Sequence, residues 1–325
     1  LRSLLALRDF RFFLSGRFLG TLASQILSVA VGWQIYEITK SPMALGFVGL
    51  AQFLPMFLLL LPAGDVADRV DRRLIASASY LLQAAAVAML AAFTWAGVAE
   101  HAIWPFYLAL VILGCARAFS GPATRAFVPL LVSTRQLPRG IAISSSSFLT
   151  ATIVGPALGG FIYIGGPLAA YGTCFVFFLI CAVAFFAIRT RHKQEPADPT
   201  LTTFGRVTAG VRFIRRKPIV LGAISLDLFA VLLGGAAALM PIFAADILHV
   251  GPQGLGILRS APALGAVLIN FMLIALPLHR HAGYAMFACV AIFGLATITF
   301  GLSENFALSF AALLIMGGSD MISVY

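Results

Sequence analysis

The chain has few charged residues and few cysteines. Only 10% of its 325 residues are charged, whereas 61% are hydrophobic, well above the roughly 45–50% of soluble domains. One soluble core cannot bury that much apolar surface, so we expect an all-α polytopic membrane protein. The cysteines lie inside apolar runs without metal-like spacing, which indicates packing residues rather than disulfides or metal ligands. They are Cys115, Cys174, Cys181 and Cys289.

Common catalytic motifs are also missing. The sequence contains no His-Glu-x-x-His, no Gly-x-Ser-x-Gly and no phosphate loop. Its five histidines lie near the ends of apolar runs, where solvated loop histidines are the ordinary expectation: His101, His192, His249, His279 and His281. We therefore expect no enzyme activity, no cofactor and no bound metal.

Ten apolar segments are long enough to cross a membrane, since a span needs about 20 residues. Each must be helical, because an unpaired backbone amide in lipid costs several kcal/mol. The segments are 12–36, 43–62, 74–98, 103–132, 141–164, 168–188, 219–245, 254–276, 284–302 and 306–325. Turn signals separate several of them: Lys40-Ser41-Pro42, Gly165-Gly166-Pro167 and Gly251-Pro252.

The distribution of Lys and Arg predicts the orientation. With the N-terminus inside, 17 of the 22 Lys and Arg residues fall on inside segments, and Lys40 alone falls outside. This bias accounts for the net charge of +10 without nucleic acid as a partner. It predicts a multi-pass protein of the cell inner membrane with a cytoplasmic N-terminus and the lipid bilayer as its surroundings.

A weak internal repeat divides the chain. A shift of 210 residues sets Pro42, Leu45 and Gly46 on Pro252, Leu255 and Gly256, and a shift of 203 sets Leu113-Gly114 on Met316-Gly317. Such similarity is typical of two membrane halves related by an axis along the membrane normal. We expect a six-helix half over 1–188, a basic cytoplasmic linker over 189–217, and a second half over 218–325. The linker is either solvated or an interfacial amphipathic helix.

The second half holds only four of the predicted spans. Nothing in the sequence matches the fifth and sixth spans of the first half. We therefore expect a truncated second half, in which spans seven to ten are present and spans eleven and twelve are absent.

Ionisable residues inside apolar spans cost about 2.5–3.5 kcal/mol each to insert. Those that we expect to line a proton and substrate pathway are Arg17, Arg117, Asp227, Asp320 and Arg259, whereas Arg125 lies near a span end and is expected to snorkel. The two shifts set Arg17 on Asp227 and Arg117 on Asp320. We hypothesise that both aspartates carry protons, because a cationic neighbour changes the proton affinity of a carboxylate. The alternative is fixed ion pairs that hold helices together.

Uncharged polar residues in the spans are the other cavity candidates. They are Gln25, Gln34, Gln52, Ser144 to Ser147 and Asn270, with the aromatic residues Trp33 and Phe148. The serine run fits a helix interface equally well. An apolar cavity with arginines favours an amphipathic or anionic ligand over a sugar.

The densest charge in the chain lies in ten residues between the second and third predicted spans. This stretch, 64–73, holds six charged residues. It predicts a tight turn at the membrane face, and its candidate gating residues are Gly64, Asp65, Asp68, Arg69, Arg72 and Arg73. The plainer interpretation is an ordinary positive cytoplasmic loop.

Three stretches resemble signatures of the major facilitator superfamily. They are the glycine, Asp-Arg and basic pair of 64–73, the segment 113–121 around Arg117, and the Gly155-Pro156-x-x-Gly159-Gly160 motif. The resemblance implies the major facilitator fold, with two six-helix halves. It also implies a proton-coupling role for Arg117 and an antiporter hinge at Gly155, Pro156, Gly159 and Gly160.

Within that superfamily, two further segments and part of the charged stretch resemble the bacterial enterobactin-exporter branch. They are Arg8-Asp9-Phe10-Arg11, 32–36 and 67–73. This likeness implies a proton-coupled exporter of small amphipathic compounds such as siderophores or drugs, working by alternating access, and we expect a monomer. The alternatives are an importer or uniporter of the same fold, and a membrane scaffold that does not transport.

Overall fold

The computed structural model describes residues 2–98, 102–125, 127–190, 221–222, 225, 236–275 and 282–324. All regular structure in these ranges is helical. The chain divides into two compact units, Leu1–Ala197 and Asp198–Tyr325. Most of the predicted linker lies outside the described residues, so the boundaries at 188 and 217 stay a prediction.

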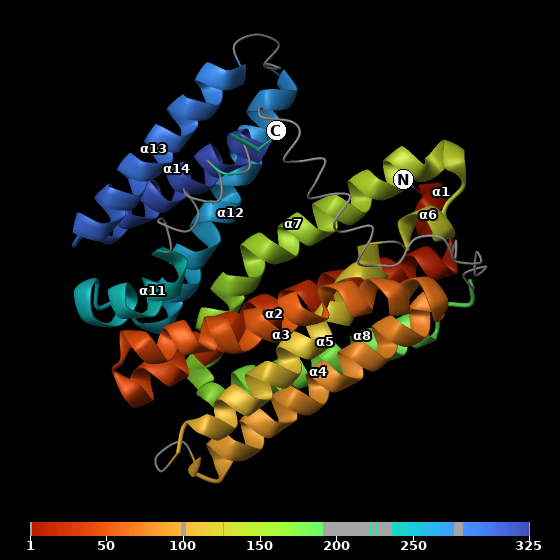
Figure 1. Cartoon of the computed structure of the whole chain (residues 1–325), viewed down its shortest axis with the longest axis horizontal. Coiled ribbons are helices and arrows are strands. Elements are labelled where there is room, and N and C mark those ends of the chain that lie inside the picture. Colours follow the sequence, from red (N-terminus) through yellow and green to blue (C-terminus); the bar gives the residue numbers. More distant parts are fainter. Residues whose placement is uncertain are drawn as a thin grey trace. The chain divides into compact units, whose positions relative to one another are not determined.

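The first unit is a bundle of six long helices with two short ones (Figure 1). Its helices are α1 Arg2–Leu5, α2 Arg8–Thr39, α3 Pro42–Arg69, α4 Arg72–Trp95, α5 Trp104–Arg125, α6 Val128–Leu131, α7 Leu137–Ile162 and α8 Pro167–Phe186. Seven described helices are long and apolar enough to cross a membrane, by length and composition, and six of them are in this unit.

The long helices of the first unit pack in a fixed spatial order. α3 packs against α5, α5 against α4, α4 against α8, α8 against α2, and α2 against α7 (Figure 1). α3 and α7 therefore lie at the two ends of this series, and they are the most exposed long helices of the unit. α2 packs closely on both α8 and α7.

Aromatic rings fill the interior of the bundle between α2, α4 and α8. The Tyr80 ring stacks on Phe185 with centroids 5.4 Å apart and on Phe178 at 6.1 Å. Phe13 and Phe127 complete the cluster around Phe185 at 6.2 and 5.5 Å. Each such pair contributes about 0.5–1.5 kcal/mol beyond its area burial. The cluster fixes the ring of Tyr80, whose hydroxyl end reaches the cavity described below.

The three predicted turns are confirmed by the backbone. Lys40, Gly166 and Gly251 have positive φ values of 47°, 89° and 67°, and residues with positive φ commonly end or separate helices. Pro42 and Pro167 then occupy the first turn of the next helix, where a missing N–H has no cost.

The predicted tight turn in the charged stretch 64–73 is confirmed only at Val70 and Asp71, because helix covers the rest of the stretch. α3 continues through Gly64, Asp65, Asp68 and Arg69 as helix, and α4 begins at Arg72 and includes Arg73. Helix persists because Arg69 pairs with Asp65 one turn earlier at 3.0 Å and because Asp71 caps α4 by accepting from the Arg73 backbone N–H at 3.1 Å. Only Val70 and Asp71 lie between the two helices.

The predicted fourth span, 103–132, is too long. α5 ends at Arg125, and the short helix α6 follows from Val128. Pro122 lies in the last turn of α5, and a proline stands in the first turn of α6. A proline removes an intrahelical hydrogen bond, so these positions favour a break over one continuous helix.

The second unit holds α11 Ala236–Ile242, a π-type turn Phe243–Ile247, and the longer helices α12 Gly251–Ala275, α13 Ala282–Leu302 and α14 Phe306–Val324. α14 packs against both α12 and α13. At the contact with α12, a side chain on Gly265 would run into the Leu314 carbonyl oxygen.

The weak sequence repeat corresponds to a repeated packing contact. On α5, a side chain at Gly114 would collide with the Gln52 carbonyl oxygen of α3. On α14, a side chain at Gly317 would collide with the Pro262 carbonyl oxygen of α12. Pro262 follows Gln52 by 210 positions and Gly317 follows Gly114 by 203, which are the two shifts found in the sequence.

Candidate functional site

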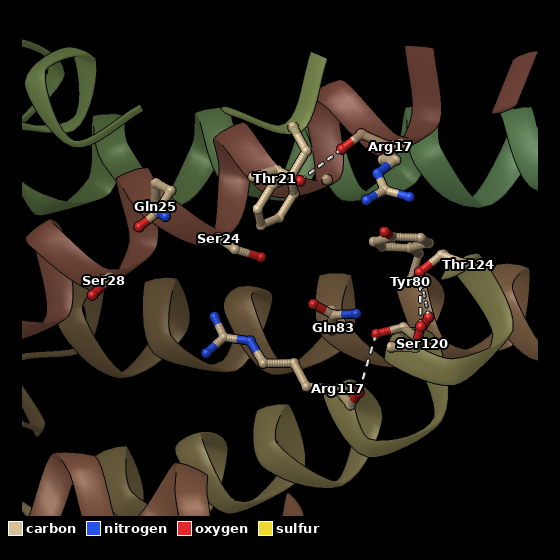
Figure 2. Close-up of a pocket in the computed structure, with 13 residues that line it drawn as sticks. Arg17, Thr21, Ser24, Gln25, Ser28, Tyr80, Gln83, Arg117, Ser120 and Thr124 are labelled. Atoms are coloured by element: carbon tan, nitrogen blue, oxygen red, sulfur yellow. Dashed lines mark hydrogen bonds between the residues drawn. The ribbon is translucent and has the colours of Figure 1, made fainter. Parts of the chain in front are cut away.

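A polar cavity of about 400 Å³ opens inside the first unit. Residues of α2, α4, α5 and α7 line it (Figure 2). They are Arg17, Gly20, Thr21, Ser24, Gln25, Ser28, Tyr80, Gln83, Arg117, Ser120, Gly121, Thr124 and Phe148. So many polar side chains in one place are unusual in so apolar a chain, which makes this cavity the candidate functional site.

One face of α2 supplies almost half of the lining. Arg17, Thr21, Ser24 and Ser28 recur at three- and four-residue spacing, which places them on one side of a helix. Figure 2 shows them along the same side of α2. Thr21 donates its hydroxyl proton to the Arg17 carbonyl oxygen at 2.8 Å, so this hydroxyl is already satisfied within its own helix.

Two guanidinium groups enter the cavity from different helices. Arg17 projects from α2, with its guanidinium carbon 5.4 Å from the centroid of the Phe148 ring. Arg117 projects from α5 and donates from Nη1 to Gln52 Oε1 at 2.6 Å. Figure 2 shows both side chains pointing into the space between α2 and α5. The structure thus brings together these two predicted pathway residues.

Two buried donors at the cavity lack a hydrogen-bond partner among the described residues. They are Gln83 Nε2 and Arg117 Nε. The Gln83 side chain is almost fully enclosed, since the residue is 1% exposed. An unsatisfied buried donor costs about 1–3 kcal/mol. The cavity therefore offers donors that a bound acceptor would satisfy.

The charge of the cavity has one sign. Among the described residues that line it there are two arginines and no Asp or Glu. On α5, Ser120 and Thr124 donate their hydroxyl protons to backbone carbonyl oxygens of the same helix. The buried cavity donors without a partner in the described structure are the Gln83 amide nitrogen and Arg117 Nε.

Glycine at position 20 makes room for the tyrosine at the cavity wall. A Cβ atom on Gly20 would lie 2.7 Å from the Tyr80 hydroxyl oxygen and 2.8 Å from its ring. The ring cannot retreat, because Phe178 and Phe185 stack on it. Gly20 therefore sets the position of Tyr80.

The predicted hinge motif lies at the interface between α7 and α2. Gly155, Pro156, Gly159 and Gly160 are all buried. A Cβ on Gly155 would lie 2.6 Å from the Gln25 Cβ, and one on Gly159 would lie 2.9 Å from the Ile26 Cα. The motif thus permits close packing of α7 on the helix that lines the cavity.

Two charged residues form hydrogen bonds with the segment that follows α8. Asp9 Oδ2 accepts hydrogen bonds from the Arg189 N–H at 3.1 Å, the Thr190 N–H at 2.9 Å and the Thr190 hydroxyl at 2.7 Å. Arg73 donates to the Ile188 carbonyl oxygen at 3.2 Å and to Asp71 at 2.8 Å. The charged stretch 64–73 is thereby connected to the segment that follows α8.

The remaining predicted pathway residues lie elsewhere. Arg259 is half-buried on α12, and Asp320 is exposed on α14, both in the second unit. Asp227 lies outside the described residues. Of the uncharged candidates, Gln25 and Phe148 line the cavity and Gln52 contacts Arg117. Gln34 instead accepts from Tyr171 and donates to Thr94 at 3.0 Å, away from the cavity.

Sequence reasoning missed Tyr80, Gln83 and the hydroxyl row of α2. A lone glutamine inside the apolar run of α4 was an available signal for Gln83. The three- and four-residue spacing of Thr21, Ser24 and Ser28 after Arg17 was an available signal for α2.

Comparison with known proteins gives consistent matches. A family model described as transmembrane secretion effector matches residues 3–324. Macrolide efflux protein A of Streptococcus pyogenes is 26% identical over 272 residues, which are 80% of this chain and 64% of that protein. The enterobactin exporter of Citrobacter koseri is 24% identical over 97% of this chain and 74% of its own length. This chain thus spans less than two thirds of the macrolide efflux protein.

The fold has a close counterpart among solved structures. The crystal structure of a bacterial homologue of the human lysosomal transporter Spinster, inward-facing and unoccupied, aligns with a TM-score of 0.70. It is 14% identical and covers 97% of this chain and 73% of its own. This likeness shows the fold alone, whereas the family match over residues 3–324 shows the family: the chain belongs to the transmembrane secretion effector family of the major facilitator superfamily.

Proposed function

We propose that the protein is a secondary active transporter that exports small amphipathic compounds in exchange for protons by alternating access. The observation that carries this proposal is the 400 Å³ polar cavity between α2, α4, α5 and α7. A polar cavity with two arginines inside an apolar bundle has a large insertion cost, so it marks a ligand or ion pathway. Export is favoured over import because the relatives include proteins named as a macrolide efflux protein and an enterobactin exporter.

Proton coupling is assigned to Asp320 and Asp227, with Arg117 and Arg259 as the cations of the pathway. Asp320 follows Gly317 by one helical turn, as Arg117 follows Gly114. Since both glycines make the same contact with the opposing helix, Asp320 occupies the position in its unit that Arg117 occupies in the other. The equivalence supports a functional role for both residues.

The moving parts of the cycle are assigned to two regions. Gly155, Pro156, Gly159 and Gly160 form the hinge where α7 rocks on α2. The gating segment comprises Gly64, Asp65, Asp68, Arg69, Arg72 and Arg73, and the Arg73 contact with the end of α8 supports its role as a latch. The N-terminus is placed in the cytoplasm, at the inner membrane, on the Lys and Arg distribution.

Transport by inside-out membrane vesicles tests the proposal. Vesicles from cells that express the full-length protein are acidified inside, and accumulation of catechol siderophores, macrolides and cationic dyes is followed. We expect accumulation of at least one compound that collapses with a protonophore and is abolished by Asp320→Asn or Asp227→Asn. Glu304→Gln serves as the matched control, because Glu304 is an exposed acid between α13 and α14.

The alternatives give different results in the same vesicles. A uniporter would equilibrate a compound without a gradient and would tolerate both Asp→Asn substitutions. An importer would accumulate compounds only in right-side-out vesicles. A scaffold would move no compound in either orientation.

A further inference from the structure

The residues that line the cavity of the first unit indicate which chemical class of substrate would bind there. We propose that Arg17, Gln83 and Arg117 form a binding site for the anionic group of an amphipathic organic acid, such as an aromatic carboxylate or sulfonate. The inference rests on the proposed function, because it takes this cavity to be the place where the exported compound binds.

The first argument is the charge of the site. Arg17 and Arg117 reach the same cavity from α2 and α5, and no Asp or Glu is among its described lining residues. A cationic ligand would be repelled by both guanidinium groups. An anion would gain charge-assisted hydrogen bonds, which are about twice as strong as neutral ones.

The second argument is that the unsatisfied hydrogen-bonding groups at the cavity are donors. The buried cavity-lining atoms without a partner in the described structure are Gln83 Nε2 and Arg117 Nε, and both are donors. Gln83 is 1% exposed, so bulk water does not satisfy its amide. Carboxylate and sulfonate oxygens accept several hydrogen bonds at once, which suits donors on two different helices.

The third argument locates the acid within the cavity. Thr21, Ser120 and Thr124 each donate their proton to a carbonyl oxygen of their own helix, so they do not compete as donors. Phe148 already packs against the Arg17 guanidinium at 5.4 Å and offers an aromatic surface beside it. The acid group is therefore assigned to the Arg17–Gln83–Arg117 side, with the apolar part of the ligand toward Phe148.

Calorimetric binding to the full-length protein in detergent micelles tests this assignment without any proton gradient. Three probes share one ring system and differ in charge: 1-naphthoate, 1-naphthamide and 1-naphthylmethylammonium. We expect 1-naphthoate to bind at least about tenfold more tightly than the other two probes, since one charge-assisted hydrogen bond is enough for that ratio.

Substitutions then assign the binding to the named side chains. We expect the affinity for 1-naphthoate to fall by about tenfold in each of three variants: Arg17→Gln, Arg117→Gln and Gln83→Leu. Arg17→Lys keeps the charge and should weaken it less than Arg17→Gln. Arg139→Gln removes an exposed arginine of α7 outside the cavity and should change nothing. Gel-filtration profiles verify that every variant is folded.

Three results would overturn the assignment: no binding of 1-naphthoate, equal binding of 1-naphthylmethylammonium, or wild-type affinity in both Arg→Gln variants. Failure here is separable from failure of the proposed function. If the protein exports a cation in response to the proton gradient but does not bind 1-naphthoate, the proposed substrate class is refuted and the exporter function is supported. If it binds 1-naphthoate but transports no compound, the anion site is supported and the exporter function is refuted.

Discussion

Arg117 on α5 donates from Nη1 to Gln52 Oε1 on α3 at 2.6 Å, and this bond joins the two helices beside the polar cavity. The Gln52 amide nitrogen donates to the Val48 carbonyl oxygen of its own helix at 3.3 Å. The amide is thereby oriented with its oxygen toward the guanidinium. Gln52 thus holds Arg117 in place without neutralising its charge.

Gln52→Leu is expected to destabilise the protein, because the Arg117 guanidinium loses its acceptor. The loss should be about 1.5–3 kcal/mol in the free energy of unfolding, measured by denaturant titration in detergent. Gln52→Glu should retain near wild-type stability yet weaken 1-naphthoate binding, since the new carboxylate neutralises Arg117. Wild-type stability of Gln52→Leu would show that the bond has no structural role.

Gly20→Ala is expected to destabilise the bundle by about 1–3 kcal/mol. The added methyl group would lie within 2.9 Å of three Tyr80 atoms, and the stacked rings of Phe178 and Phe185 prevent that ring from moving away. Gly172→Ala on α8 is the matched control. No atom lies within 4 Å of its added Cβ, so it should stabilise by up to about 1 kcal/mol. Equal effects of the two substitutions would refute the steric argument.

Two aspartates of the charged stretch are expected to contribute unequally. Asp71→Ala removes the cap of α4 and should lower the free energy of unfolding by about 0.5–2 kcal/mol. Asp65→Ala removes an ion pair with Arg69 whose side chains are 38% and 67% exposed, and such pairs contribute only about 0–1 kcal/mol. Thermal unfolding of both variants compares them. A larger effect from Asp65→Ala would contradict the capping role.

Asp9→Ala is expected to open the segment that follows α8. Asp9 Oδ2 accepts three hydrogen bonds from Arg189 and Thr190, and losing bonds to a charged group raises the open population by about tenfold or more. Limited trypsin digestion of folded protein at Arg189 reports that population. Thr190→Val removes only the hydroxyl bond and should give an intermediate rate. Cleavage at the wild-type rate in Asp9→Ala would show that other contacts hold this segment.

Much of the fold follows from the sequence, because long apolar runs in a membrane leave helix as the available structure. The turns at Lys40, Gly166 and Gly251 were also predictable, because glycine and proline residues in the local sequence favour the end of one helix and the start of the next. The charged stretch shows the limit of this reasoning. Asp65 and Arg69 indicate a loop by composition, yet at four-residue spacing they support a helix, and only the three-dimensional pairing distinguishes the two.

The cavity was predictable in part. Arg17 and Arg117 could be identified because a charged residue inside an apolar span is costly to insert and therefore indicates a functional role. The contact of Gln52 with Arg117 depends on how α3 packs against α5, which no local pattern encodes. The position of Tyr80 depends on an aromatic cluster from three helices. Whether Asp227, Arg259 and Asp320 share a pathway with these residues stays a prediction.

The glycine contacts of Gly114 with Gln52 and of Gly317 with Pro262 limit how the molecule can deform. In each pair the backbones touch directly, so neither helix can turn about its axis without pressing a side chain into its neighbour. The pair α3 with α5 and the pair α12 with α14 are therefore each rigid units. Any conformational change must occur at hinges outside these pairs. A covalent cross-link between the two helices of either pair would therefore not block that conformational change.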